Sequence, residues 1–260
     1  MSTAQILNYE VIGSGEPVLL IHGLFGDLDN LKSLGRDLSA DHQVILIDVR
    51  NHGDSFHSDS MSYADMADDV AATLDALAIP AVHIVGHSMG GKLAMEFALS
   101  YPDRVLSLIG ADIAPVAYDP RHRHILDALT SVPIDRITSR QEADKHLAQY
   151  IDEVGVRQFL LKNLRRGDSG FYWRMNLAAL NQCYPVITGS ISDGHYDGPV
   201  LLIKGGNSNY LTAEHTAAVT ARFSQVDVKI IEGAGHWLHA EKPHIFNRLA
   251  RQFIENHSRT

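Results

Sequence analysis

The sequence feature that most restricts the fold is a single serine, Ser88, set between a predicted strand and a predicted helix. The run Ala81–Val85 before it is short, apolar and rich in β-branched residues, which is typical of a buried strand in a parallel sheet. After it, Leu93, Phe97 and Tyr101 recur at helical spacing, and the pattern ends before a proline. A chain with this order of elements must turn sharply at the serine.

The residues beside the serine suit such a turn. Gly86 and Gly90 stand two positions before and after Ser88, where a strained strand-to-helix turn has room only for small residues. The turn would lift the serine hydroxyl clear of the sheet and leave the Met89 N–H at a helix N-terminus, which favours negative charge. We therefore predict that Ser88 is a nucleophile and that Met89 supplies one oxyanion-hole donor. The alternative is a plain glycine-rich turn.

Short apolar runs recur in both halves of the chain and alternate with amphipathic helical patterns. This alternation predicts an α/β fold with a mostly parallel central sheet, helices on both faces and reacting groups at the carboxyl ends of the strands. The other predicted strands are Ile6–Ile12 at an edge, Val18–Ile21, Val44–Ile47, Val105–Ile109, Val200–Ile203 and Val226–Ile231. The other predicted helices are Asp29–Leu38, one capped by Ser62 that reaches about Ile79, one capped by Thr212, and one from Pro243 to about Asn256.

The alternation stops between residues 116 and 197, where helical patterns follow one another. We interpret this segment as a helical lid inserted into the α/β domain. The predicted organisation is a core domain of residues 1–115 and 198–260 with a lid of residues 116–197. The predicted lid helices are His122–Leu129, Arg140–Ile151, Val156–Leu164 and Tyr172–Cys183.

The loop His22-Gly23-Leu24-Phe25-Gly26 is the candidate for the second oxyanion donor. Glycine-flanked loops at the carboxyl end of a central strand place backbone groups against ligands. Leu24 is the first choice for the donating N–H, and Phe25 is the alternative. For His22 we favour a hydrogen bond that orients the loop over a role as catalytic base.

The general base should come late in the chain, on a loop that can lean over the serine. His236 follows the last predicted strand, and the preceding Gly233-Ala234-Gly235 gives its loop the freedom to aim the imidazole at Ser88. His239 and His244 are competitors that we expect at the solvated surface.

Composition argues against several classes of partner. A net charge of −9 and a pI near 5.9 are unsuited to nucleic acid or an anionic membrane, which call for a basic face. Met1–Glu10 has no secretion-signal pattern and no apolar stretch is long enough to span a membrane, so we expect a cytoplasmic protein. The lone Cys183 is expected to be a small buried hydrophobe.

The histidines show no metal-ligand spacing, and His122 and His124 would point to different sides of a helix. We therefore expect surface histidines and no metal.

Five segments together resemble the α/β-hydrolase superfamily along nearly the whole chain, and most closely the small bacterial esterases of the YbfF type and their abhydrolase relatives. They are His22–Gly26, Asp48–Ser55, Gly86–Lys92, Asp112–Pro115 and Gly205–Ser208. The resemblance implies a serine hydrolase that acts on small-molecule carboxylic esters, or on acyl thioesters such as acyl-CoA, through an acyl-serine intermediate. No cofactor and no obligate protein partner are implied. Perhydrolase or carbon–carbon hydrolase chemistry, and a hydrolase-fold receptor with little turnover, are the alternatives.

The acid of the expected catalytic triad departs from the superfamily pattern. It usually follows the strand that is here Val200–Ile203, yet residues 204–211 contain no Asp or Glu. Asp112 follows the Val105–Ile109 run, so its carboxylate should emerge at the same sheet edge as the nucleophile. The resemblance to YbfF-type esterases implies the same displaced position. Asp197 precedes its strand and should lie at the opposite edge of the sheet, so Asp112 is the predicted acid. The alternative role for Asp112 is to cap the start of the lid.

Residues 119–175 carry ten Lys or Arg and eight Asp or Glu, so this part of the lid is slightly cationic over an acidic core. A cationic rim could steer a phosphate-bearing substrate such as acyl-CoA. The alternative is an ordinary solvated helix face.

Overall fold

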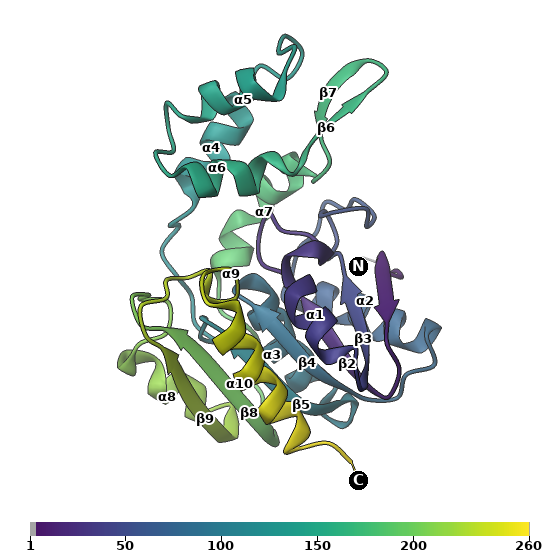
Figure 1. The fold of residues 1–260 in the computed structure, drawn as a ribbon. Coiled ribbons are helices and arrows are strands. Elements are labelled where there is room, and N and C mark those ends of the chain that lie inside the picture. The colour runs from purple at the N-terminus through teal and green to yellow at the C-terminus, as the bar shows by residue number, and fades with distance from the viewer. Residues whose placement is uncertain (1–3, 260) are drawn as a thin grey trace.

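A seven-stranded sheet forms the body of the protein, with its strands side by side in Figure 1. The structure is a computed structural model that describes residues 4–259. The strand order is β1-β3-β2-β4-β5-β8-β9; β1 runs antiparallel to β3, and the other neighbouring pairs are parallel. The strands are β1 Tyr9–Ile12, β2 Glu16–Ile21, β3 His42–Ile47, β4 Val82–His87, β5 Val105–Ala111, β8 Tyr196–Gly205 and β9 Phe223–Ile231.

Helices cover both faces of this sheet (Figure 1). They are η1 Leu28–Leu31, α1 Lys32–Leu38, α2 Tyr63–Ala76, α3 Met89–Ser100, η2 Pro102–Arg104, η3 Ala213–His215, α8 Thr216–Thr220, α9 Leu238–Glu241 and α10 Pro243–Glu255. Alternate residues of a strand point to opposite sides, so the strands feed two separate cores. Leu19, Ile45 and Ile84 join residues of α2 and α3 on one side, whereas Val18 and Leu46 join residues of α1 and α10 on the other.

The α/β fold predicted from the sequence is confirmed, and each predicted strand overlaps an observed one. The edge strand, predicted from Ile6, begins only at Tyr9. Its preceding backbone is bonded elsewhere, because the Leu7 N–H donates to Thr73 Oγ1 at 2.9 Å instead of to a neighbouring strand. Ser62 caps α2 as predicted.

Between β5 and β8 the chain leaves the sheet and builds a separate group of elements above it (Figure 1). We call residues 116–195 the inserted segment; the predicted end at residue 197 falls two residues inside β8. Its elements are α4 Arg123–Ser131, α5 Arg140–Leu147, α6 Val154–Leu161, the hairpin of β6 Leu164–Gly167 and β7 Gly170–Trp173, and α7 Leu177–Thr188. Within residues 4–259, no helix is long and apolar enough to cross a membrane.

The prediction of a helix over Tyr172–Cys183 is wrong in its first part. Gly170–Trp173 instead pairs with Leu164–Gly167 as an antiparallel hairpin, and α7 begins only at Leu177. Gly170 has a φ of 122°, which glycine adopts readily, and the aromatic residues after it favour a strand. The other three predicted helices of this segment are present, with shifted ends.

Candidate active site

Ser88 occupies the sharp turn between β4 and α3 with φ 53° and ψ −119°. The close approach of the backbone explains both flanking glycines. A Cβ on Gly86 would lie 2.0 Å from the carbonyl oxygen of Gly90, and a Cβ on Gly90 would lie 2.4 Å from the carbonyl oxygens of Ile21 and His22. No real side chain tolerates such distances, so the strained conformation of the serine requires glycine at both positions.

The structure brings Ser88, His236 and Asp112 together at the carboxyl edge of the sheet. His236 Nε2 lies 2.9 Å from Ser88 Oγ, and His236 Nδ1 lies 2.7 Å from Asp112 Oδ2. Asp112 follows β5 directly and is fully buried. Asp197 is the second residue of β8, at the start of the strand, where it is exposed to solvent, contacts His195 and is remote from this edge.

The loop after β8, which contains no acid, supports the Asp112 carboxylate instead. The Gly205 N–H donates to Asp112 Oδ1 at 3.0 Å, and the Ser208 hydroxyl donates to Asp112 Oδ2. These donors supply hydrogen bonds to a carboxylate that has no exposure to solvent. Sequence reasoning missed Ser208, although its segment was one of those that carry the family resemblance.

Two residues that sequence reasoning also missed contact His236, one at its backbone and one at its ring. The His87 Nε2–H donates to the His236 carbonyl oxygen at 2.8 Å, and the Tyr210 ring stacks on the imidazole at 3.8 Å with an interplanar angle of 20°. The Tyr210 hydroxyl lies 3.2 Å from His122 Nε2. Burial lowers the pKa of His122 to about 4, so this ring is neutral at neutral pH. In the sequence, only the position of His87 next to Ser88 indicated that either residue belongs to the site.

The expectation of surface histidines is wrong for several residues. His239 is only 9% exposed, because α9 turns it inward against the His87 ring, whose centroid is 4.3 Å away. Burial lowers the pKa of His239 to about 4. His122 is half-buried in the site, whereas His124 and His244 are exposed. Further buried histidines are His22, His42, His52, His83 and His87.

Hydrogen bonds to two buried histidines position the loop that contains Leu24 and Phe25. The Phe25 N–H donates to His52 Nε2 at 3.1 Å, and the Val49 N–H donates to His22 Nε2 at 3.0 Å. Burial lowers the pKa of His52 to about 3, so its ring remains an acceptor at neutral pH. Among the described residues, no protein group accepts a hydrogen bond from the N–H of Leu24 or of Met89. These two unused donors, Leu24 and Met89, are the residues predicted first from the sequence as oxyanion-hole donors.

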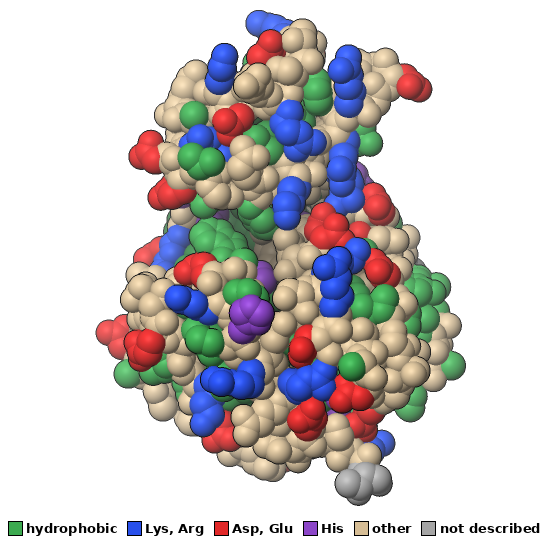
Figure 2. Space-filling model, in the orientation of Figure 1, with side chains coloured by type: hydrophobic (Ala, Val, Ile, Leu, Met, Phe, Trp, Pro, Cys, Tyr) green, Lys and Arg blue, Asp and Glu red, His purple; other side chains and the backbone are tan. Residues whose placement is uncertain are grey.

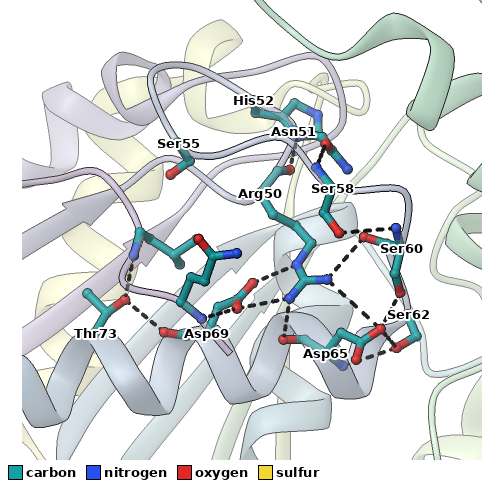
Figure 3. Close-up of polar contacts among 12 residues, drawn as sticks. Arg50, Asn51, His52, Ser55, Ser58, Ser60, Ser62, Asp65, Asp69 and Thr73 are labelled. Carbon is teal, nitrogen blue, oxygen red and sulfur yellow. Dashed lines mark hydrogen bonds and ion pairs between the residues drawn. The ribbon is translucent and has the colours of Figure 1, made fainter. Parts of the chain in front are cut away.

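A buried ion pair anchors the segment that carries His52 (Figure 3). The Arg50 guanidinium binds both carboxylate oxygens of Asp69 on α2, at 2.6 Å and 2.9 Å, and also donates to the carbonyl oxygens of Ser60 and Asp65. Arg50 and Asp69 are both fully buried. Because the pair is bidentate and well supplied with acceptors, it fixes the path of the chain from β3 to α2.

Two pockets meet at Ser88. The first is mainly apolar, with side chains contributed both by the body and by α4 and α6 of the inserted segment; they include Leu24, Ile125, Phe159, Leu160 and Trp237. The second contains Met89, Lys92, Tyr118, Arg121, His122 and Tyr210, among others. Figure 2 shows the molecule narrowed between the inserted segment and the body, with hydrophobic side chains in the recess. Ser88, Leu24 and His122 line both pockets, so the serine lies at their junction.

Comparison with known proteins points to one class. A family profile described as alpha/beta hydrolase fold matches residues 16–135. The chain is 42% identical over 244 residues to Esterase YbfF of Escherichia coli (strain K12), covering 94% of each protein. It is 38% identical over 247 residues to sn-1-specific diacylglycerol lipase ABHD11 of Mus musculus, covering 91% of this chain and 80% of that protein. A solved structure titled Marine microorganism esterase matches with a TM-score of 0.94 and 39% identity, covering 96% of this chain and 100% of that one.

The fold, the serine at its strained turn and these relatives define a serine hydrolase of the esterase kind. The resemblance found in the sequence is confirmed. The chain belongs to the α/β-hydrolase family.

Proposed function

We propose that Ser88, His236 and Asp112 form the catalytic triad of a carboxylic ester hydrolase. The observation that supports this role is the continuous chain of contacts from the buried Asp112 carboxylate through the imidazole to Ser88 Oγ, at 2.7 Å and 2.9 Å. An acid on one nitrogen of the ring and a hydroxyl on the other is the arrangement in which serine becomes a nucleophile.

The reaction has two halves. His236 Nε2 takes the Ser88 proton as Oγ attacks the ester carbonyl, and the imidazolium formed is stabilised by Asp112 on Nδ1. The imidazolium then protonates the departing alcohol, which leaves an acyl-serine. In the second half His236 removes a proton from water, the hydroxide displaces Ser88 Oγ, and the proton returns to the serine.

The N–H groups of Leu24 and Met89 are the proposed oxyanion hole. Phe25 is the weaker candidate, because its N–H donates to His52 Nε2. The buried acceptor holds the loop in place while leaving the Leu24 N–H for the substrate. In such holes one donor typically contributes about a hundredfold to a thousandfold in turnover.

We further propose that the inserted segment serves as a lid over the acyl pocket. This role is supported by Ile125 of α4 and Phe159 of α6, which line the pocket together with Ser88. A hydrophobic lid excludes water from the oxyanion and positions an acyl chain.

Acyl thioesters such as acyl-CoA are the second proposed substrate class, because the same triad releases a thiol as readily as an alcohol. Arg165 and Arg166 are exposed on β6 of the slightly cationic inserted segment. In the Arg165→Ala/Arg166→Ala double variant, kcat/KM for butyryl-CoA should fall at low salt while that for a neutral butyrate ester stays constant. Equal effects on the two substrates would remove the steering role.

Turnover of p-nitrophenyl butyrate by the full chain tests the central proposal. The parent should turn over steadily, and Ser88→Ala should lose at least about a thousandfold in kcat, since only the residual contribution of binding and oxyanion donors remains. Ser33→Ala, at an exposed position of α1, is the matched control and should keep parental kinetics. A Ser88→Ala protein with near-parental turnover would contradict the proposal, and a parent that binds the ester without turning it over would favour the receptor alternative.

A further inference from the structure

A buried lysine lies beside the nucleophile. Lys92 is one helical turn beyond Ser88 on α3, and its backbone N–H donates to the Ser88 carbonyl oxygen at 3.1 Å. Its side chain lines the second pocket together with Ser88 and Met89, and the residue is only 1% exposed. A turn of helix advances about 5.4 Å, so the backbones of Ser88 and Lys92 lie close together, and both residues line the same pocket.

This lysine has no carboxylate partner in the described part of the chain. The one acid at helical spacing on its own helix, Glu96, is used by Ser192, whose N–H and hydroxyl donate to it at 2.8 Å and 2.7 Å. Lys92 Nζ donates to the carbonyl oxygen of Gly189 at 2.5 Å and, more weakly, to that of Thr188 at 3.4 Å. A buried ammonium ion held only by neutral groups is a costly arrangement. Burial accordingly lowers the pKa of Lys92 to about 7.

Two aromatic rings lie near Lys92 Nζ, but no carboxylate among the described residues supplies its counter-charge. Nζ lies 4.8 Å from the ring centroid of Tyr118 and 5.7 Å from that of Tyr63. Arg121 lines the same pocket and lies over the Tyr210 ring at 4.7 Å. The one acidic side chain among the described lining residues is Asp119, which is exposed and forms no ion pair with Lys92. When Lys92 is protonated, the two basic side chains outweigh the one exposed acid and the pocket is positive.

We propose that this pocket binds the anionic end of the substrate, so that the preferred esters carry a carboxylate a few bonds from the scissile carbonyl. The proposal rests on the ester hydrolase function above and adds a substrate class to it. The carboxylate would supply the counter-ion that Lys92 lacks, with Arg121 at the mouth of the pocket. Lys92 is then a specificity-determining residue as well as a contact to the end of α7.

Two esters of equal acyl length test this assignment. Monoethyl adipate is anionic at pH 7, ethyl hexanoate is neutral, and ethanol release is measured for both with the full chain. We expect the parent to favour the adipate half-ester in kcat/KM, and Lys92→Gln to lower the ratio of the two values by about tenfold or more, chiefly through KM. Lys92→Arg should restore part of the ratio. Arg123→Gln removes a charge from α4 without lining the pocket, and its ratio should match the parent's.

A second measurement covers the case in which Lys92→Gln does not fold. Adipate dianion should inhibit ethyl hexanoate hydrolysis by the parent competitively, neutral adipamide should inhibit much less, and Arg121→Gln should weaken inhibition by adipate. Equal losses on both esters in Lys92→Gln would mean that the lysine acts only through α7, and a parent with no preference for the anion would also overturn the assignment. Hydrolysis of neither ester by the parent would instead contradict the proposed function itself.

Discussion

The position of Asp112 shows how one residue can be displaced along a sheet without loss of geometry. The carboxylate leaves from β5 instead of β8, yet it still reaches His236 Nδ1 at 2.7 Å. The loop after β8 then contributes Gly205 N–H and the Ser208 hydroxyl, which are donors to the acid. Because β5 and β8 are parallel neighbours, their carboxyl ends meet, and either strand can serve the same histidine.

Replacing Asp112 by Asn should separate the orienting role from folding. We expect Asp112→Asn to lose at least about a hundredfold in kcat, because an amide favours the wrong imidazole tautomer and cannot stabilise the imidazolium. Thermal unfolding and circular dichroism should show that the variant still folds.

Asp197→Asn is the matched control, since Asp197 lies at the opposite edge of the sheet and is exposed. Its turnover should stay within about twofold of the parent, as for most surface substitutions. Near-parental activity in Asp112→Asn together with a large loss in Asp197→Asn would reverse the assignment of the acid.

Much of the site could be anticipated at this scale, because its residues have strong local signals. Ser88 lies between two glycines that the backbone requires, and His236 follows a glycine-rich loop after the last strand. The supporting residues could not be anticipated. Tyr210 and His87 act through a stacked ring and a backbone carbonyl, contacts between distant parts of the chain that a single sequence does not reveal, even though His87 lies next to Ser88.

Among the secondary-structure elements, the strands of the sheet agree well with the prediction from the sequence, and the elements of the inserted segment agree less well. The central strands β2, β3, β4 and β5 contain continuous apolar runs because they are covered on both faces, which makes them easy to recognise. In the inserted segment, Tyr172 and Trp173 begin the apolar pattern from which a helix to Cys183 was predicted, but these two residues belong to a hairpin. A two-stranded hairpin and a short helix can share the same apolar positions, and only the turn at Gly170 distinguishes them.

The segment between β3 and α2 depends on the Arg50–Asp69 pair, and this dependence can be measured. Asp69→Asn removes the bidentate carboxylate from a fully buried guanidinium, so we expect a loss of about 3–5 kcal/mol in the free energy of unfolding. Urea unfolding followed by circular dichroism gives the value. Asp75→Asn breaks the exposed contact to Arg104 and should cost less than about 1 kcal/mol. Similar losses in the two variants would show that the buried pair is not the anchor of this segment.

For the whole molecule, the buried histidines make stability depend on pH. His239 has a pKa lowered to about 4 by burial, from an ordinary value of 6.5. Below pH 6.5 the unfolded chain binds a proton at this residue that the folded protein does not bind until about pH 4. The stability that the neutral ring contributes is therefore fully present above pH 6.5 and is lost as the pH falls towards 4.

Each such residue should add about 1.4 kcal/mol per pH unit to the slope of stability against pH between 6.5 and 4. We expect His239→Phe to reduce this slope by about that amount, measured by urea unfolding at pH 5, 5.5 and 6. His244→Phe, at an exposed position of α10, should give a curve parallel to the parent's because its side chain is solvated in both states. Parallel curves for His239→Phe and the parent would show that this ring does not couple folding to pH.

We propose that the molecule as a whole activates one hydroxyl, that of Ser88, and covalent capture of this hydroxyl tests the proposal most directly. The parent should react with a fluorophosphonate at one equivalent per chain, and peptide mass spectrometry should locate the adduct on Ser88. Ser88→Ala should take up no label, and Asp112→Asn should label much more slowly than the parent. Stoichiometric labelling at another residue, or undiminished labelling of Ser88→Ala, would contradict the assignment of Ser88 as the nucleophile.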